Sequence, residues 1–166
     1  IFLMQDKNNN ALIWLILSGL IILFDWISKQ WALSSLEYMQ SIEVIPGFWN
    51  WTLVHNRGAA FSFLASAGGW QQWLFSGLAV TISAVCIVML KNANRSDWRT
   101  ALPLALIVGG ALGNLIDRIR FGYVIDFVHW YYGSFHWPVF NLADSAISIA
   151  AVMLIVLSFR FEQKET

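Results

Sequence analysis

Residues 69–90 read GWQQWLFSGLAVTISAVCIVML, an apolar stretch without a charged side chain. An α-helix rises about 1.5 Å per residue, so about 20 such residues cross the hydrocarbon core of a bilayer. Backbone polar groups must be satisfied within a segment that lies in lipid, and this favours a helix. The stretch therefore predicts a membrane-spanning helix.

Three further stretches approach the same length, at residues 11–28, 101–118 and 141–159. Of the 166 residues, 58% are hydrophobic and 12% are charged, which is about half the charge of a soluble domain. The mean hydropathy is +0.59, so the excess apolar surface needs lipid. The predicted fold class is an all-α membrane protein with four transmembrane helices, in a single polytopic domain over residues 1–166.

The first outer connection, residues 31–67, is long for a structureless loop. A Pro46-Gly47 turn signal precedes residues 48–55, FWNWTLVH, which are aromatic and β-branched and predict one or two short strands. We expect a small outer β-sheet, or cradle, over about residues 36–67 on the membrane surface. The second connection, residues 118–140, is rich in aromatic residues and is interrupted by Pro138.

The distribution of Lys and Arg between the loops predicts that both termini are cytoplasmic, because the loop at residues 91–100 is short and basic. The chain starts at Ile1 without a signal-peptide layout, and we interpret the first residues as a tag remnant before a native Met4. The formal net charge of zero gives no reason to expect a nucleic-acid partner. With both termini cytoplasmic, the cytoplasmic side carries Lys7, Lys91, Arg95, Arg99, Arg160 and Lys164. The outer side carries Lys29, Arg57, Arg118 and Arg120.

Two carboxylates, Asp126 and Asp144, lie near the outer ends of apolar segments. An acidic group at the edge of a bilayer is costly unless it is paired or functional. The two are 18 positions apart across a short polar and aromatic stretch, so they can meet at one membrane face. Carboxylates at close range share a proton and can carry out acid/base hydrolysis.

The neighbours of the two carboxylates predict different protonation states. Asp126 follows Val124 and Ile125 in an apolar patch, where desolvation raises the pKa of a carboxyl. Asn141 reads as an N-cap, which places Asp144 in the first turn of the fourth helix, where the helix dipole favours a charged side chain. One acid then holds a proton while the other activates water, as in an aspartic protease. The alternative for Asp144 is a helix-stabilising role alone.

The third span ends with polar residues after glycines. Gly109 and Gly113 are spaced for close helix packing. Asn114, Asp117 and Arg118 share one helical face. We expect Arg118 to bind a carbonyl or a lipid head group while Asp117 neutralises it; a purely structural polar clamp is the alternative.

Asp25 and Lys29 are spaced i,i+4 at the outer end of the first span. They form either a local helix ion pair or a brace for the site. A metal is the competing use of the carboxylates, because His129 follows Asp126 by three residues and His136 is nearby. The chain has no His-Glu-x-x-His motif and no cysteine cluster, so no metal is predicted.

Two other functions compete with hydrolysis. A small transporter or channel could use Asp126 and Asp144 as proton or cation relays, but it would need a polar path through the helices. The second and fourth spans offer only scattered Ser and Thr. A membrane scaffold built on the Gly109/Gly113 surface would not need two carboxylates.

Five motifs together resemble the lipoprotein signal peptidase family, signal peptidase II. They extend in order from the first span to the fourth, and the combination is specific although no single motif is. The motifs are Asp25-x-x-Ser28-Lys29, Asn56-Arg57-Gly58-Ala59-Ala60-Phe61-Ser62, Gly109-Gly110-Ala111-Leu112-Gly113-Asn114-Leu115-Ile116-Asp117-Arg118, Val124-Ile125-Asp126-Phe127 and Phe140-Asn141-Leu142-Ala143-Asp144-Ser145.

The resemblance implies a bacterial inner-membrane aspartic endopeptidase with four transmembrane helices, an outer β-cradle and no cofactor. Such enzymes cut the signal peptide from prolipoproteins just before a cysteine that carries diacylglyceryl. It implies that Asp126 and Asp144 are catalytic, and that Asn114 and Arg118 contact the substrate or the cyclic peptide antibiotic globomycin. The positions that it implies shape the site are Asn56, Asp117, Asn141, Asp25 and Lys29.

Overall fold

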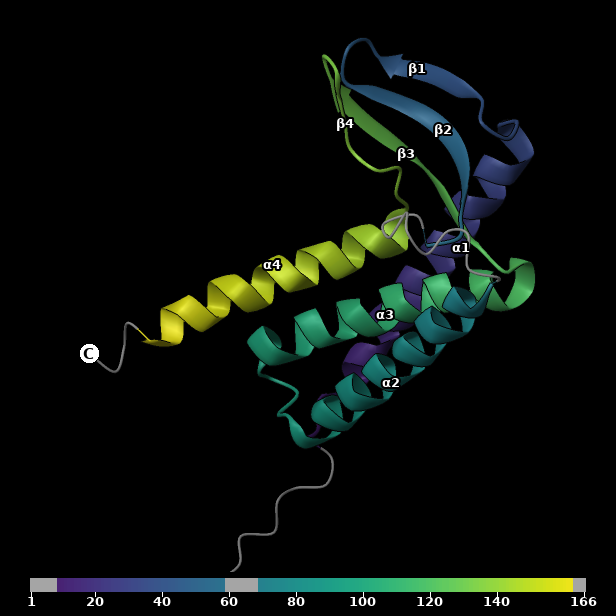
Figure 1. Cartoon of the computed structure of the whole chain (residues 1–166). Coiled ribbons are helices and arrows are strands. Elements are labelled where there is room, and N and C mark those ends of the chain that lie inside the picture. Colours follow the sequence, from purple (N-terminus) through teal and green to yellow (C-terminus); the bar gives the residue numbers. More distant parts are fainter. Residues whose placement is uncertain (1–8, 59–68, 163–166) are drawn as a thin grey trace, which may run out of the picture.

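The computed structural model describes residues 9–58 and 69–162, and Figure 1 shows their arrangement. Within that part, four helices are long and apolar enough to cross a membrane, over Ala11–Ser35, Trp70–Asn92, Trp98–Phe121 and Leu142–Phe159. The predicted fold class is confirmed, although the first span continues to Ser35 instead of ending at residue 28. The helices are α1 (Leu15–Ser35, after the 3-10 turn η1, Ala11–Trp14), α2 (Trp70–Asn92), α3 (Trp98–Phe121) and α4 (Leu142–Glu162).

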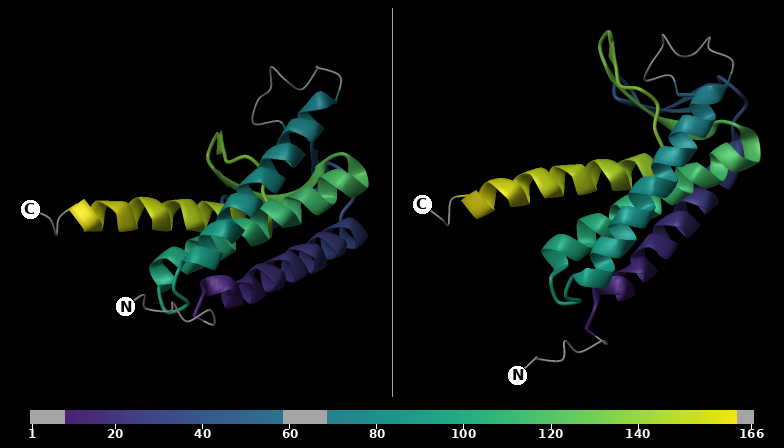
Figure 2. Two further views of the ribbon diagram at one scale, coloured as in Figure 1. Left: turned by 90° about the horizontal axis from the view of Figure 1, so that it is seen from below. Right: turned by 60° about the horizontal axis from the view of Figure 1, so that its bottom comes forward.

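Helix α3 forms the centre of the bundle. In its most apolar window 67% of the residues are buried, whereas the corresponding windows of the other three spans are only 17–22% buried. Those three helices expose large apolar side chains, among them Ile16, Val85 and Ile155. Such continuous apolar surfaces face lipid in a membrane protein. Figure 2 shows α4 diverging from the other helices toward its C-terminus, so only the first part of α4 packs closely on α3.

Glycines allow α3 to approach α1 and α4 closely. A Cβ atom on Gly109 would lie 2.8 Å from a side-chain atom of α1. A Cβ on Gly110 would lie 2.5 Å from the carbonyl oxygen of Ala143, and one on Gly113 would lie 2.9 Å from a carboxylate oxygen of Asp25. None of these gaps admits a methyl group without a shift of its neighbours. The expected close packing at Gly109 and Gly113 is confirmed, and Gly110 extends it to the start of α4.

A four-stranded antiparallel sheet stands at the end of the bundle where α1 and α3 end and α4 begins (Figure 1). Its strands, in spatial order, are β1 (Ser41–Ile45), β2 (Trp49–Asn56), β3 (Val124–Tyr132) and β4 (Phe135–His136). The strand predicted at residues 48–55 corresponds to β2, and β1 lies within the predicted cradle over residues 36–67. Strand β3, expected only as part of an aromatic connection, pairs with β2 and brings Asp126 opposite Val54.

Aromatic packing attaches the sheet to the bundle. The Trp31 ring, near the end of α1, lies 5.0 Å from the Trp51 ring of β2 and 6.1 Å from the Phe127 ring of β3. Phe127 and the neighbouring Ile125 are buried in the same cluster. Because these residues flank Asp126 on β3, their packing against α1 holds Asp126 in position relative to the helix bundle.

Two of the expectations cannot be placed on the fold. The interpretation of Met4 as a native start concerns residues outside the described part of the chain. The same is true of residues 59–67 of the predicted cradle, which include the last four residues of the second motif.

Candidate active site

Asp126 is held in β3 with 1% of its surface exposed. The Asn56 side-chain amide donates to its Oδ2 atom at 2.8 Å, and the Asn141 amide donates to its Oδ1 atom at 2.8 Å. Burial, and secondly the charge of Asp144, raise the pKa of Asp126 to about 8. The apolar neighbours in the sequence predict this direction, which is confirmed. Asp126 therefore carries a proton at neutral pH.

Asp144 lies in the first turn of α4 and is partly exposed, as the N-cap at Asn141 predicts. Its backbone N–H donates to Asn141 Oδ1 at 2.9 Å, while its Oδ2 atom accepts from the Asn141 backbone N–H at 3.2 Å. This reciprocal pair has the pattern of a capping box. The remaining oxygen, Oδ1, accepts from the Asn114 side chain at 2.7 Å.

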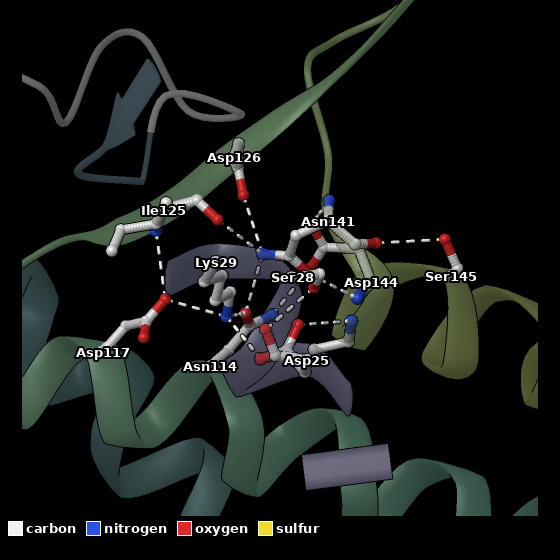
Figure 3. Close-up of polar contacts among 11 residues, drawn as sticks. Asp25, Ser28, Lys29, Asn114, Asp117, Ile125, Asp126, Asn141, Asp144 and Ser145 are labelled. Carbon is white, nitrogen blue, oxygen red and sulfur yellow. Dashed lines mark hydrogen bonds and ion pairs between the residues drawn. The ribbon is translucent and has the colours of Figure 1, made fainter. Parts of the chain in front are cut away.

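Two asparagines connect the carboxylates, as Figure 3 shows. Asn141 is fully buried and contacts Asp126 through its side chain and Asp144 through its backbone. Its side-chain nitrogen also lies 3.0 Å from Asn114 Oδ1, and Asn114 in turn donates to Asp144. The structure thus brings the two predicted acids to one site at the end of the bundle, joined by a continuous set of hydrogen bonds.

Lys29 forms a buried ion cluster beneath Asp126 and Asp144, which we call the dyad. Its ammonium nitrogen lies 2.7 Å from Asp25 Oδ2 and 2.8 Å from Asp117 Oδ2. The i,i+4 pair that the sequence predicts is therefore present, and its lysine also forms an ion pair with Asp117 of α3. Asp117 makes its close ion pair with Lys29, while its charge also acts on Arg118, so the expected interaction of Asp117 with Arg118 is electrostatic and not a direct ion pair.

Arg118 instead lies over the ring of Phe75 in α2, 5.4 Å from its centroid. It remains near enough to Asp144 and Asp126 to interact electrostatically with both. No pattern in the sequence indicates Phe75 as its partner, because only the packing of α2 on α3 brings them together. Arg118 is thus a cation at the margin of the site, as expected, with a different neighbour.

Asn56 ends β2 and belongs to the site, as the sequence predicts. Its side-chain oxygen accepts from the Gly58 backbone N–H at 2.8 Å while its nitrogen donates to Asp126. Gly58 has φ +99°, a conformation that favours glycine, and allows the chain to turn directly after the strand. This turn orients the Asn56 amide toward Asp126.

The histidines lie away from the dyad. His129 follows Asp126 by three positions on a strand, which places it on the opposite sheet face. There its Nε2 atom lies 3.0 Å from His136 Nδ1. No group of three or more His, Cys, Asp or Glu side chains able to hold a metal occurs in residues 9–58 and 69–162. The two histidines are therefore not positioned to share a metal with Asp126.

Sequence comparison shows the family of the chain. A family model described as signal peptidase (SPase) II matches residues 17–160. A protein named lipoprotein signal peptidase from Xanthomonas oryzae pv. oryzae (strain PXO99A) is 54% identical over 152 residues, with 92% of each chain covered. A protein of the same name from Xylella fastidiosa (strain M12) is 53% identical over 162 residues, covering 98% of this chain and 96% of its own.

Solved structures agree with the sequence comparison. One, described as a bacterial membrane enzyme determined by the in meso method at 2.3 Å resolution, has a TM-score of 0.81, 26% identity and 95% of each chain covered. Another, described in the same way at 1.9 Å resolution, has a TM-score of 0.76 and 28% identity, covering 90% of this chain and 95% of its own. The family model that matches residues 17–160 and the relatives more than 50% identical show that the chain belongs to the signal peptidase II family.

Proposed function

We propose that this protein is an aspartic endopeptidase that removes the signal peptide from diacylglyceryl-modified prolipoproteins, cutting just before the lipidated cysteine. The observation that carries the proposal is the link between Asp126 and Asp144 through Asn141, which contacts both carboxylates. One acid is buried and the other partly exposed, so they differ in the way that acid/base hydrolysis requires.

The proposed reaction divides the work between the two acids. Asp144 takes a proton from a water molecule as the water oxygen attacks the scissile carbonyl carbon, and Asp126 gives its proton to the carbonyl oxygen. In the second step the C–N bond breaks, the proton on Asp144 passes to the leaving nitrogen, and a hydroxyl of the intermediate returns a proton to Asp126. The products are a carboxylate and the free amino group of the lipidated cysteine. No group other than the dyad is needed for the proton transfers.

The position of the dyad suits a substrate that stays in the membrane. Asp126 and Asp144 lie where α4 begins and the sheet meets the bundle (Figure 1), at the end of the apolar spans. A prolipoprotein with one transmembrane segment and two acyl chains can reach this level from lipid, along the exposed apolar surfaces of the helices. Membrane lipid is therefore both the solvent and the route of approach.

The function is tested by cleavage of two matched substrates. We expect the purified protein to cut a prolipoprotein whose cysteine carries diacylglyceryl and to leave the same unlipidated polypeptide intact, with the new N-terminus identified by mass spectrometry. A chelator should not change the rate. Cleavage of neither substrate, or a loss of activity on chelation that zinc restores, would contradict the proposal.

The pKa of Asp126 predicts a loss of activity at high pH. Because Asp126 must be protonated to donate, kcat/KM should fall as the pH rises through about 8. The hydrogen bond from Asn56 stabilises the ionised form and lowers that pKa. Asn56→Ala should therefore move the basic limb of the pH profile to higher pH.

The control is Asn50→Ala on the same strand. Asn50 pairs with His129 and donates to Ser41, away from the dyad. This variant should therefore keep the basic limb of the pH profile at the wild-type pH. If the basic limb of the pH profile of Asn56→Ala were unmoved or shifted to lower pH, Asp126 would not be the titrating acid.

We further propose that the protein lies in the bacterial inner membrane with both termini cytoplasmic and the dyad toward the periplasm. The basic connection between α2 and α3 supports this orientation. In a Cys86→Ala background, a membrane-impermeant maleimide added to spheroplasts should label Ser134→Cys, between β3 and β4. It should label Ser96→Cys, between α2 and α3, only after permeabilisation. The reverse labelling pattern would invert the orientation.

The same site should bind a globomycin-type cyclic peptide. Asn114, which donates to Asp144, and Arg118, at the margin of the site, are the side chains proposed to contact it. Such an inhibitor should raise the apparent KM for the lipidated substrate without changing kcat. A pure fall in kcat would place the inhibitor elsewhere.

A further inference from the structure

The buried Lys29 ammonium is surrounded by acceptors from two helices. Lys29 is only 1% exposed. It contacts Asp25 within α1, and Asp117 and Asn114 across on α3, the latter at 3.1 Å. A buried ion pair is weak evidence for stability, because desolvation offsets much of its attraction. The further contacts of the partners of Lys29 therefore indicate what the cluster does.

Each carboxylate that Lys29 holds also accepts from the backbone directly before one of the two dyad aspartates. Asp25 Oδ1 accepts from the Ala143 N–H at 2.9 Å, and Ala143 immediately precedes Asp144. Asp117 Oδ2 accepts from the Ile125 N–H at 3.1 Å, and Ile125 immediately precedes Asp126. Figure 3 shows Asp117 in contact with both Ile125 and Lys29.

Lys29 also decides which way the Asn114 amide faces. An ammonium group can only donate, so the Asn114 atom that faces it must be the oxygen. The Asn114 nitrogen is then directed at Asp144, to which it donates at 2.7 Å. The Asn141 side-chain nitrogen, which donates to the same Asn114 oxygen at 3.0 Å, supports this orientation together with Lys29.

We infer that Lys29, through Asp25 and Asp117, sets the separation and orientation of Asp126 and Asp144. The three are positioning residues, since none of them touches the proposed reacting atoms. The inference rests on the proposed function and deepens it: the ion cluster is a spacer between two backbone segments that come from a strand and a helix far apart in sequence. A misplacement of reacting groups by about 1 Å can lower a rate about 100-fold.

The test compares Lys29→Met with a matched variant of the same helix contact. Lys29→Met should lower kcat for the lipidated substrate about 100-fold and change KM less than about threefold. It should also move the basic limb to higher pH, because the charge of Lys29 lowers the pKa of Asp126. The control is Ser18→Ala: Ser18 is buried and donates from α1 to the Ala105 carbonyl of α3 at 2.8 Å, far from the dyad. It should lower Tm while leaving kcat and the limb unchanged.

A pair of substitutions at Asp25 keeps the test valid if Lys29→Met does not fold. Asp25→Asn retains an oxygen that can accept from the Ala143 N–H, whereas Asp25→Leu does not. We expect Asn to retain most of kcat and Leu to lose it. Equal kcat in the two Asp25 variants, or wild-type kcat and limb in Lys29→Met, would overturn the inference. Failure of the proposed function is separate, because it would appear as cleavage that persists without Asp126 or Asp144.

Discussion

Asp126→Asn and Asp144→Asn should each lower the rate of prolipoprotein cleavage about 10³-fold or more, while the folded protein remains in the membrane. Removing one member of an interdependent catalytic set typically costs this much, because the partner cannot complete the proton transfer alone. The amide is nearly isosteric with the carboxylate. It keeps one oxygen that can accept from Asn141 or Asn114, so the hydrogen-bonded frame should persist.

The measurement is single-turnover cleavage of the lipidated substrate, with Tm recorded for each variant. Asp97→Asn is the matched control: Asp97 caps the start of α3 at the opposite end of the bundle, accepting from Thr100. It should cleave at the wild-type rate. If either dyad variant retained that rate, the two-acid mechanism would be rejected.

Much of the fold was predictable because local signals dominate it. Membrane-length apolar stretches specify helices whatever their neighbours, since lipid leaves the backbone no other partner. The N-cap at Asn141 was equally local, and it correctly placed Asp144 in the first turn of α4. The largest difference in a span boundary is at the end of the first span, because α1 continues to Ser35 beyond the lipid-length stretch, and the third span extends three residues further at each end, as Trp98–Phe121.

The misses within the site and the sheet involve contacts between distant segments. Strand β3 was not predicted, because its aromatic residues become a strand by pairing with β2, about 70 positions earlier in the chain. Sequence proximity paired Asp117 with Arg118, but the close ion pair of Asp117 is with the buried Lys29 of another helix. The sequence indicated which residues belong to the site, and the tertiary structure decides how they are connected.

Asn141→Ala should lower kcat about 100-fold, because it removes the side chain that joins the two acids. Asn141 donates to Asp126 and to the Ile125 carbonyl, and it accepts from the Asp144 N–H. Its loss frees Asp126 from α4, and small displacements of reacting groups carry large rate costs. The variant should also lose about 1 kcal/mol of stability as the N-cap disappears.

Asn141→Ser separates these two effects. Serine is a good N-cap and can still accept from the Asp144 N–H, but its side chain is too short to reach Asp126. We therefore expect Asn141→Ser to restore Tm to near the wild-type value while kcat stays about as low as in Asn141→Ala. A serine variant with wild-type kcat would mean that Asn141 acts only by starting α4. Asp126 would then owe its position to β3 and Asn56 alone, and the proposed coupling of strand and helix at this residue would fail.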